Sequence, residues 1–222
     1  MLSVLQEDVA NLNPFSIQMP ATAAPPKVAS LAQRCRKFSS GGYLDLVPST
    51  LDLMYVAVGS ASGNVATLEA RYAAFMADAR ANYDVILIDC HPAGSILTKT
   101  SLGNSDDVLV PVVTHQFAAR GISLMKTFIQ ASRPTNPPVM HVLFNMTARR
   151  GASSVETGLR ADVHFSKYCL RSSLKKFKAF ADPHEGEGFV GESSAPYSTE
   201  AFSNISTVTT EIAKRLLDPK GV

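Results

Sequence analysis

The chain has 222 residues, of which 45% are hydrophobic and 18% are charged, and its formal net charge is +2. This composition is typical of a globular protein and excludes an intrinsically disordered or collagen-like chain. The sequence contains no apolar run of the roughly 18 residues that a transmembrane helix needs. Glu7 and Asp8 lie where a signal peptide would be apolar, and three widely spaced cysteines form no disulfide framework. Both features predict a cytoplasmic protein with reduced thiols.

The first half of the chain predicts mixed secondary structure. Residues 1–24 have no clear period and are expected to be irregular. Pro25-Pro26 is typical of a helix start, apolar residues then recur at helical spacing, and Gly41-Gly42 is expected to end that helix. Residues 43–47 alternate and predict a short strand, whereas residues 64–82 carry one apolar stripe and predict an amphipathic helix.

The second half predicts a parallel sheet. Three unbroken apolar runs, typical of strands buried on both faces, are followed or separated by helical patterns at 117–131 and 199–217. The runs lie at residues 85–89, 108–113 and 140–144. Strands alternating with helices indicate an α/β fold with a parallel sheet and helices on both faces. We therefore expect one α/β domain over residues 25–222, with the three runs as adjacent or near-adjacent strands.

The charges are unevenly distributed along the chain. Residues 131–180 contain nine Lys or Arg against two Asp or Glu, whereas residues 1–130 contain nine against ten and residues 181–222 three against seven. Seven of the basic residues form what we call the basic segment: Arg149, Arg150, Lys167, Arg171, Lys175, Lys176 and Lys178. Such a segment is either a solvated face or a DNA-binding surface, and the scarcity of acids favours DNA.

Other chemistries receive little support. The five histidines include no pair at i,i+3 or i,i+4 spacing, so no direct metal site is predicted. No GxSxG motif occurs, so the sequence does not support a serine hydrolase. Asp89 ends the apolar run 85–89, where an α/β fold places ligands, but an acid in that position is also a common turn cap.

Several collinear motifs resemble the ParA/MinD family of partition ATPases. Residues 83–92, YDVILIDCHP, resemble its Walker B segment, and residues 106–112, DDVLVPV, followed by Phe117-Ala118 and Gly121-Ile122, resemble the next strand and helix. Residues 143–150, LFNMTARR, are similar to the strand that ends in an Asn and a basic pair. Residues 181–186, ADPHEG, resemble the loop around the nucleotide base, and residues 43–52, YLDLVPSTLD, resemble an upstream stretch.

The resemblance implies a P-loop NTPase-like fold of the deviant Walker type and a set of site residues. Asp89 would hold the water shell of Mg²⁺, and Asn145, Pro183 and Gly186 would contact the base of ATP. From the residues alone, Asn145 is equally well explained as the end of a turn, and Pro183 and Gly186 as parts of a surface loop. ATP and Mg²⁺ are therefore implied by the resemblance only.

One departure from the family is large. The family begins with a P-loop, yet no glycine in this sequence is followed by lysine, so the motif GxxxxGK[ST] does not occur. The first βα unit is therefore expected to be missing, as in a chain truncated at its N-terminal side. Without groups that hold the β- and γ-phosphates, we expect residues 1–222 not to hydrolyse ATP.

Three functions remain open. The first is a ParA-like DNA-partition protein acting in plasmid or chromosome segregation, associated with the bacterial nucleoid. Its implied partners are non-specific DNA, a ParB-like centromere-binding protein and a second copy of the chain, but no membrane. The second is a non-catalytic DNA- or protein-binding module of the same fold. The third is a MinD-like positioning regulator, which the Pro219 after the last helix disfavours, because that branch ends in a membrane-binding helix.

Overall fold

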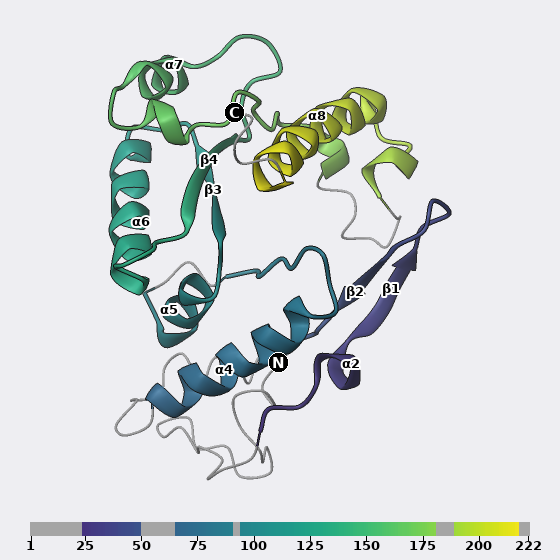
Figure 1. The fold of residues 1–222 in the computed structure, drawn as a ribbon. Coiled ribbons are helices and arrows are strands. Elements are labelled where there is room, and N and C mark those ends of the chain that lie inside the picture. Colours follow the sequence, from purple (N-terminus) through teal and green to yellow (C-terminus); the bar gives the residue numbers. More distant parts are fainter. Residues whose placement is uncertain (1–23, 50–64, 91–93, 181–188, 218–222) are drawn as a thin grey trace. The chain divides into compact units, whose positions relative to one another are not determined.

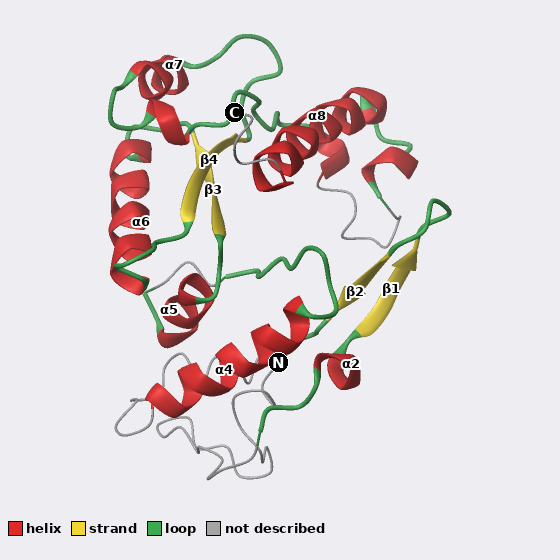
Figure 2. Cartoon of the chain, in the orientation of Figure 1, coloured by secondary structure: helices red, strands yellow, loops and turns green. Residues whose placement is uncertain are grey.

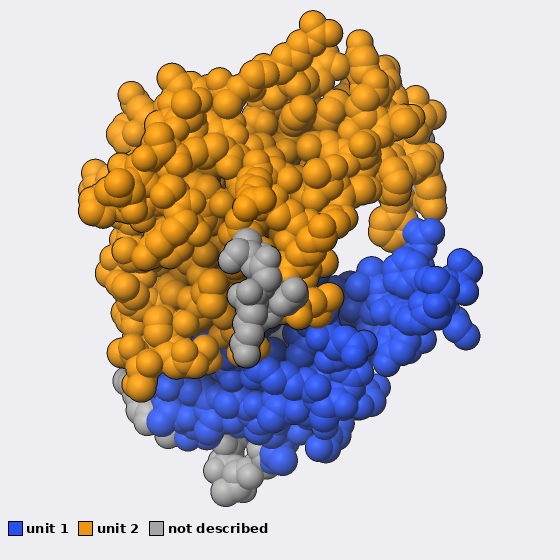
Figure 3. Space-filling view, turned by 45° about the horizontal axis from the view of Figure 1, so that its top comes forward, with its two compact units in different colours: residues 1–104 blue, residues 105–222 orange. Residues whose placement is uncertain are grey.

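The computed structural model describes residues 24–49, 65–90, 94–180 and 189–217. The chain divides into two compact units, residues 1–104 and residues 105–222 (Figure 3). The division does not test the predicted domain over residues 25–222, because a compact unit need not fold on its own. The predicted irregular stretch 1–24 lies almost entirely outside the described residues.

Unit 1 begins with a short helix and a hairpin, where one long helix was predicted. Helix α2 spans only Val28–Leu31, and β1 (Gln33–Lys37) pairs antiparallel with β2 (Tyr43–Leu46). Gly41 and Gly42 have φ of 90° and 77°, so they close the hairpin rather than end a helix. The helix prediction for residues 33–40 is wrong, because strand pairing overrides the helical spacing there, whereas the strand predicted at 43–47 is confirmed.

The core of unit 1 lies on one face of α4 (Val65–Arg80), which confirms the predicted amphipathic helix. Leu68, Tyr72, Phe75, Met76 and Ala79 are buried on this face together with Val28 of α2. Asp78 joins the two helices, because its carboxylate accepts a hydrogen bond of 2.8 Å from the Val28 backbone N–H. A further helix, α5 (Ile96–Gly103), was not predicted; the Ser95 side chain caps it by accepting from the Thr98 N–H.

Residues 85–89 do not form the predicted strand. They run as an extended segment in which Ile86 and Ile88 contact the core on α4, whereas Val85 and Leu87 are 52% and 85% exposed. An apolar run is buried on both faces only when strands flank it on both sides. Among the described residues no strand pairs with this segment, and this explains why one of its faces is open.

Unit 2 is built on the predicted parallel strand pair. β3 (Asp107–Val113) and β4 (Val139–Asn145) lie side by side with Asp107 paired to Val139 and Val113 paired to Asn145. Residues 140–144 are all buried. The two other predicted strands, 108–113 and 140–144, are therefore confirmed as adjacent and parallel.

Helices cover both faces of this strand pair, as predicted. α6 (Ala118–Ser132) contacts β3 and β4 on one side, and α8 (Ser198–Leu217) lies on the other (Figure 1). On the α8 side, Leu143 is buried with Leu170 and with Val208 of α8. Figure 2 shows the strands between these helices, with α7 (Ser154–Ala161) and the short helices Ser166–Tyr168, Lys178–Phe180 and Val190–Glu192 in the connections.

Candidate nucleic-acid interface

The residues expected to hold a nucleotide are only partly described. Asn145 ends β4, and its side-chain oxygen accepts a hydrogen bond of 2.8 Å from the Met146 N–H. Met146 has a φ of 54°, so this bond stabilises the bend after β4. The base-binding role of Asn145 stays a prediction. Asp89 is exposed at the end of the extended segment in unit 1. Pro183 and Gly186 lie outside the described residues, and the expected juxtaposition of Asp89 with Asn145 stays a prediction.

The basic segment lies at the surface of unit 2. Arg149, Arg150, Lys167, Arg171, Lys176 and Lys178 are exposed, and Lys175 is half-buried. Within the part of the chain that the structure describes, none of the seven forms an ion pair. Arg149 instead lies over the ring of Tyr197 at 4.3 Å. Among the described acids, therefore, none neutralises these seven charges.

Backbone pairing places much of this segment beside the end of β4. Residues 169–176 run parallel to β4, where the Leu170 N–H donates to the Val142 carbonyl and the Leu174 N–H to the Phe144 carbonyl, each at 2.8 Å. Thr147, just beyond β4, accepts from the Lys176 N–H at 2.9 Å. This pairing brings Lys175 and Lys176 next to the loop that carries Arg149 and Arg150. Four of the seven basic residues therefore gather at the carboxyl end of β4.

Polar side chains of α8 fix the same stretch from the other side. Both carboxylate oxygens of Glu211 accept backbone N–H groups, from Arg171 and from Ser172, each at 2.7 Å. About two turns earlier in α8, the Asn204 side chain accepts a hydrogen bond from the Lys175 N–H at 2.8 Å and donates one to the Ser173 carbonyl at 3.0 Å. α8 thus satisfies four backbone groups of residues 171–175, while the Arg171 side chain stays exposed and the Lys175 side chain is half-buried.

The hydrogen bonds from Arg171 and Ser172 stabilise the charged form of the Glu211 carboxyl group. Burial acts to raise its pKa, but the hydrogen bonds from Arg171 and Ser172 and the charge of Arg215 outweigh it, and the pKa is lowered. A carboxyl with a lowered pKa stabilises the folded state above its unfolded pKa, and that contribution is lost as the pH falls through the folded pKa.

We expect Glu211→Gln to destabilise unit 2 by about 2 kcal/mol at pH 7. The glutamine amide has only one acceptor oxygen, whereas the backbone N–H groups of Arg171 and Ser172 each donate to a separate oxygen of Glu211. The difference from wild type should begin to shrink as the pH falls below the unfolded pKa of glutamate, about 4.3, and should disappear as the pH falls through the lowered folded pKa. Urea unfolding followed by circular dichroism at pH 7 and at pH 3.5 measures both effects. Glu200→Gln, at an exposed glutamate of the same helix, is the control. An undiminished difference at pH 3.5 would contradict the role of the charge.

A second carboxylate acts from α7. Glu156 is 4% exposed and accepts from Arg160 Nη2 at 2.9 Å and from the Ser173 hydroxyl at 2.6 Å. Arg160 also donates to the Leu170 carbonyl, and its guanidinium lies over the Phe144 ring at 4.8 Å. From α8, Arg215 donates to the Cys169 carbonyl at 3.0 Å. Two Glu/Arg pairs at i,i+4 spacing therefore hold residues 169–173 from two helices.

A family model described as an AAA domain matches residues 27–140, which is about half of the chain. The chain belongs to this AAA domain family. Within the family it is ParA-like. It is 31% identical over 127 residues to the chromosome partitioning protein ParA of Caulobacter vibrioides, covering 55% of this chain and 47% of that protein.

Two further relatives agree with this placement. The sporulation initiation inhibitor protein Soj of Bacillus subtilis is 33% identical over 100 residues, which cover 44% of this chain and 38% of Soj. The ParA protein of Myxococcus xanthus is 34% identical over 96 residues, covering 43% of this chain and 33% of that protein. The ParA-like chain thus spans less than half the length of these relatives.

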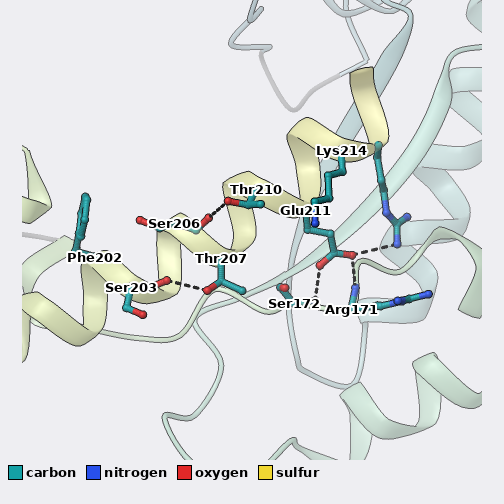
Figure 4. A pocket seen from close by; sticks show the side chains of 10 residues that line it. Arg171, Ser172, Phe202, Ser203, Ser206, Thr207, Thr210, Glu211 and Lys214 are labelled. Atoms are coloured by element: carbon teal, nitrogen blue, oxygen red, sulfur yellow. Dashed lines mark hydrogen bonds and ion pairs between the residues drawn. The ribbon is translucent and has the colours of Figure 1, made fainter. Parts of the chain in front are cut away.

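The AAA domain match ends before the basic segment of this ParA-like chain begins. The geometry of that surface in the described residues is what supports its role. It includes an open pocket of about 870 Å³ between residues 171–172 and α8, lined by Arg171, Lys214 and hydroxyl side chains such as Ser206 and Thr210 (Figure 4). Lys214 was missed by the sequence analysis, although its spacing of four and eight residues from Thr210 and Ser206 places all three on one helix face.

Two findings bear on metals and membranes. In residues 24–49, 65–90, 94–180 and 189–217, no group of three His, Cys, Asp or Glu side chains is arranged to hold a metal ion. No helix within those same ranges is both long and apolar enough to span a bilayer.

Proposed function

We propose that this chain is a DNA-partition protein of the ParA type that binds DNA without sequence preference through its basic segment. The observation that carries the proposal is the set of seven basic side chains on unit 2, none of which pairs with a described acid. Phosphate contacts by Lys and Arg need no base recognition, so such a surface binds any duplex.

The geometry of the surface supports this role. The backbone of residues 170–176 is held by hydrogen bonds to β4, α7 and α8, so the stretch that carries Arg171, Lys175 and Lys176 starts from a fixed position. A fixed surface loses less conformational entropy on binding than a flexible tail does. Because two relatives are named as chromosome partitioning proteins, the proposal includes a role in the segregation of a plasmid or chromosome. It also places the protein in the cytoplasm, in association with the nucleoid.

The remaining parts of the family cycle belong to the same proposal. ATP with Mg²⁺ near Asp89 and Asn145, a homodimer and a ParB-like centromere-binding partner follow from the family rather than from the described side chains. A non-catalytic DNA-binding module is the second candidate. The same basic side chains support it, because phosphate contacts through Lys and Arg need no hydrolysis.

The test is DNA binding by the full chain at low salt. We expect two unrelated 30-base-pair duplexes to bind with equal affinity, and log K to fall linearly with log salt, with a slope of roughly −0.9 for each phosphate contacted. Fluorescence anisotropy from about 50 to 300 mM NaCl measures both quantities. No binding at 50 mM NaCl, or a flat salt dependence, would rule the proposal out.

A further inference from the structure

The β1–β2 hairpin, residues 33–46, concentrates positive charge outside the basic segment. Residues 24–44 contain four basic side chains and no acidic one. Three of the four, Arg34, Arg36 and Lys37, lie on β1. Asp45 is the first acid after them, and it is engaged by Arg34 in an ion pair and by the Tyr83 hydroxyl at 2.8 Å. The hairpin therefore presents a net positive charge.

The hairpin also exposes apolar surface. Phe38, Leu44 and Leu46 are 43%, 44% and 53% exposed, and every residue of β1 except Arg36 is exposed. Tyr43 attaches the hairpin to the rest of unit 1 through an edge contact with Tyr83, at 6.0 Å between ring centroids. An isolated two-stranded ribbon is only marginally stable in water, so a partner that covers this one would stabilise it.

The chemistry of the ribbon favours duplex DNA as this partner. A two-stranded ribbon fits the major groove, and positive side chains along it face the phosphates on either side. Base stacking is less favoured, because the two aromatic rings are already covered by guanidinium groups. Arg34 lies over Tyr43 at 3.8 Å, and Arg36 lies over Phe38 at 5.7 Å.

We propose that the β1–β2 hairpin is a second DNA-binding element, which contacts the backbone of duplex DNA through Lys37 and the arginines of β1. This inference rests on the proposed function, because it requires that the chain bind DNA. It adds a contact from unit 1 to the one that the basic segment makes from unit 2. The two contacts lie on different units, so each can be removed separately.

Cys35 provides a direct probe of the hairpin. It is exposed on β1 between Arg34 and Arg36, whereas Cys169 is buried and burial raises the pKa of its thiol. We expect a saturating 30-base-pair duplex at about 50 mM NaCl to slow alkylation of Cys35 by N-ethylmaleimide at least fivefold, with recovery of the rate at high salt. Peptide mass spectrometry quantifies Cys35 and Cys169 in the same sample, so Cys169 serves as the internal control.

A variant provides the second measurement. We expect Lys37→Ala with Phe38→Ala to weaken DNA binding about tenfold at 50 mM NaCl and to flatten the salt slope by roughly 0.9, the value of one phosphate contact. Lys99→Ala, which removes an equal charge from α5 of the same unit, should leave both unchanged. Circular dichroism verifies that each variant is folded.

The outcomes separate the two proposals. The hairpin contact would be overturned if the wild type binds DNA without protecting Cys35 and the hairpin variant binds DNA as tightly as the wild type. The proposed function would then remain intact. Wild type that does not bind at 50 mM NaCl would overturn both. Protection of Cys35 by poly-L-glutamate equal to that by DNA would assign the hairpin to an acidic protein partner instead, and would overturn the DNA contact.

Discussion

Replacing Lys175, Lys176 and Lys178 together by Ala is expected to lower the affinity for duplex DNA by up to about a thousandfold at 50 mM salt. Each phosphate contact contributes roughly tenfold at this salt concentration through counterion release, and three contacts would be lost. The salt slope should flatten by up to about three units. The fold should be kept, because the bonds that hold this stretch are made by the backbone groups of Lys175 and Lys176. Anisotropy titrations across a salt series give both numbers.

The matched control removes the same charge elsewhere. The triple variant Lys99→Ala, Arg120→Ala, Lys126→Ala takes three basic side chains from α5 and α6 and leaves the basic segment unchanged. If binding depends on net charge alone, both triple variants will lose affinity equally. Equal binding by wild type and the Lys175/Lys176/Lys178 variant would show that these lysines form a solvated face.

Glu156→Ala is expected to destabilise unit 2 by about 3 kcal/mol, since removing one partner of a buried pair leaves the other without compensation. Arg160, whose side chain is 27% exposed, would lose its partner, and the Ser173 hydroxyl would lose its acceptor. Because Arg160 also holds the Leu170 carbonyl, hydrogen exchange at residues 169–173 should increase. Urea unfolding and hydrogen-exchange mass spectrometry measure the two effects.

The control for this prediction is apolar replacement of the whole pair. Glu156→Leu with Arg160→Met should recover much of the lost free energy of unfolding, because a buried ion pair and an apolar pair of similar volume are close in stability. Glu200→Ala, at an exposed glutamate, should cost under about 0.5 kcal/mol. A Glu156→Ala variant as stable as Glu200→Ala would mean that the pair does not hold the basic segment.

Local patterns in the sequence were enough to predict the elements whose apolar faces follow one period. The stripe on residues 64–82 predicted α4, and the periods at 117–131 and 199–217 predicted α6 and α8, each within two residues of its observed bounds. The apolar runs at 108–113 and 140–144 predicted β3 and β4. These faces must be buried wherever the chain folds, so the pattern alone identifies them.

Local patterns failed where a segment's state depends on its partner. Residues 33–37 carry a spacing compatible with a helix but pair with β2 as a strand. Residues 85–89 have the composition of a buried strand but find no strand partner among the described residues. A short apolar or mixed segment takes the conformation that satisfies its backbone groups, and those groups bond to residues far away in the sequence.

The candidate DNA surface shows the same division. By itself, the sequence determined that the seven basic side chains would lie at the surface, because hydrated Lys and Arg side chains are almost never buried without a partner; six are exposed and Lys175 is half-buried. Only the tertiary structure decided where they gather. Two side chains of α8, Glu211 and Asn204, accept hydrogen bonds from the backbone of residues 171–175, from up to 40 residues away in the sequence. Glu156 of α7 binds the neighbouring side chains of Arg160 and Ser173. The hydrogen-bonding needs of a backbone are local, but the side chains that satisfy them are brought there by packing on β4.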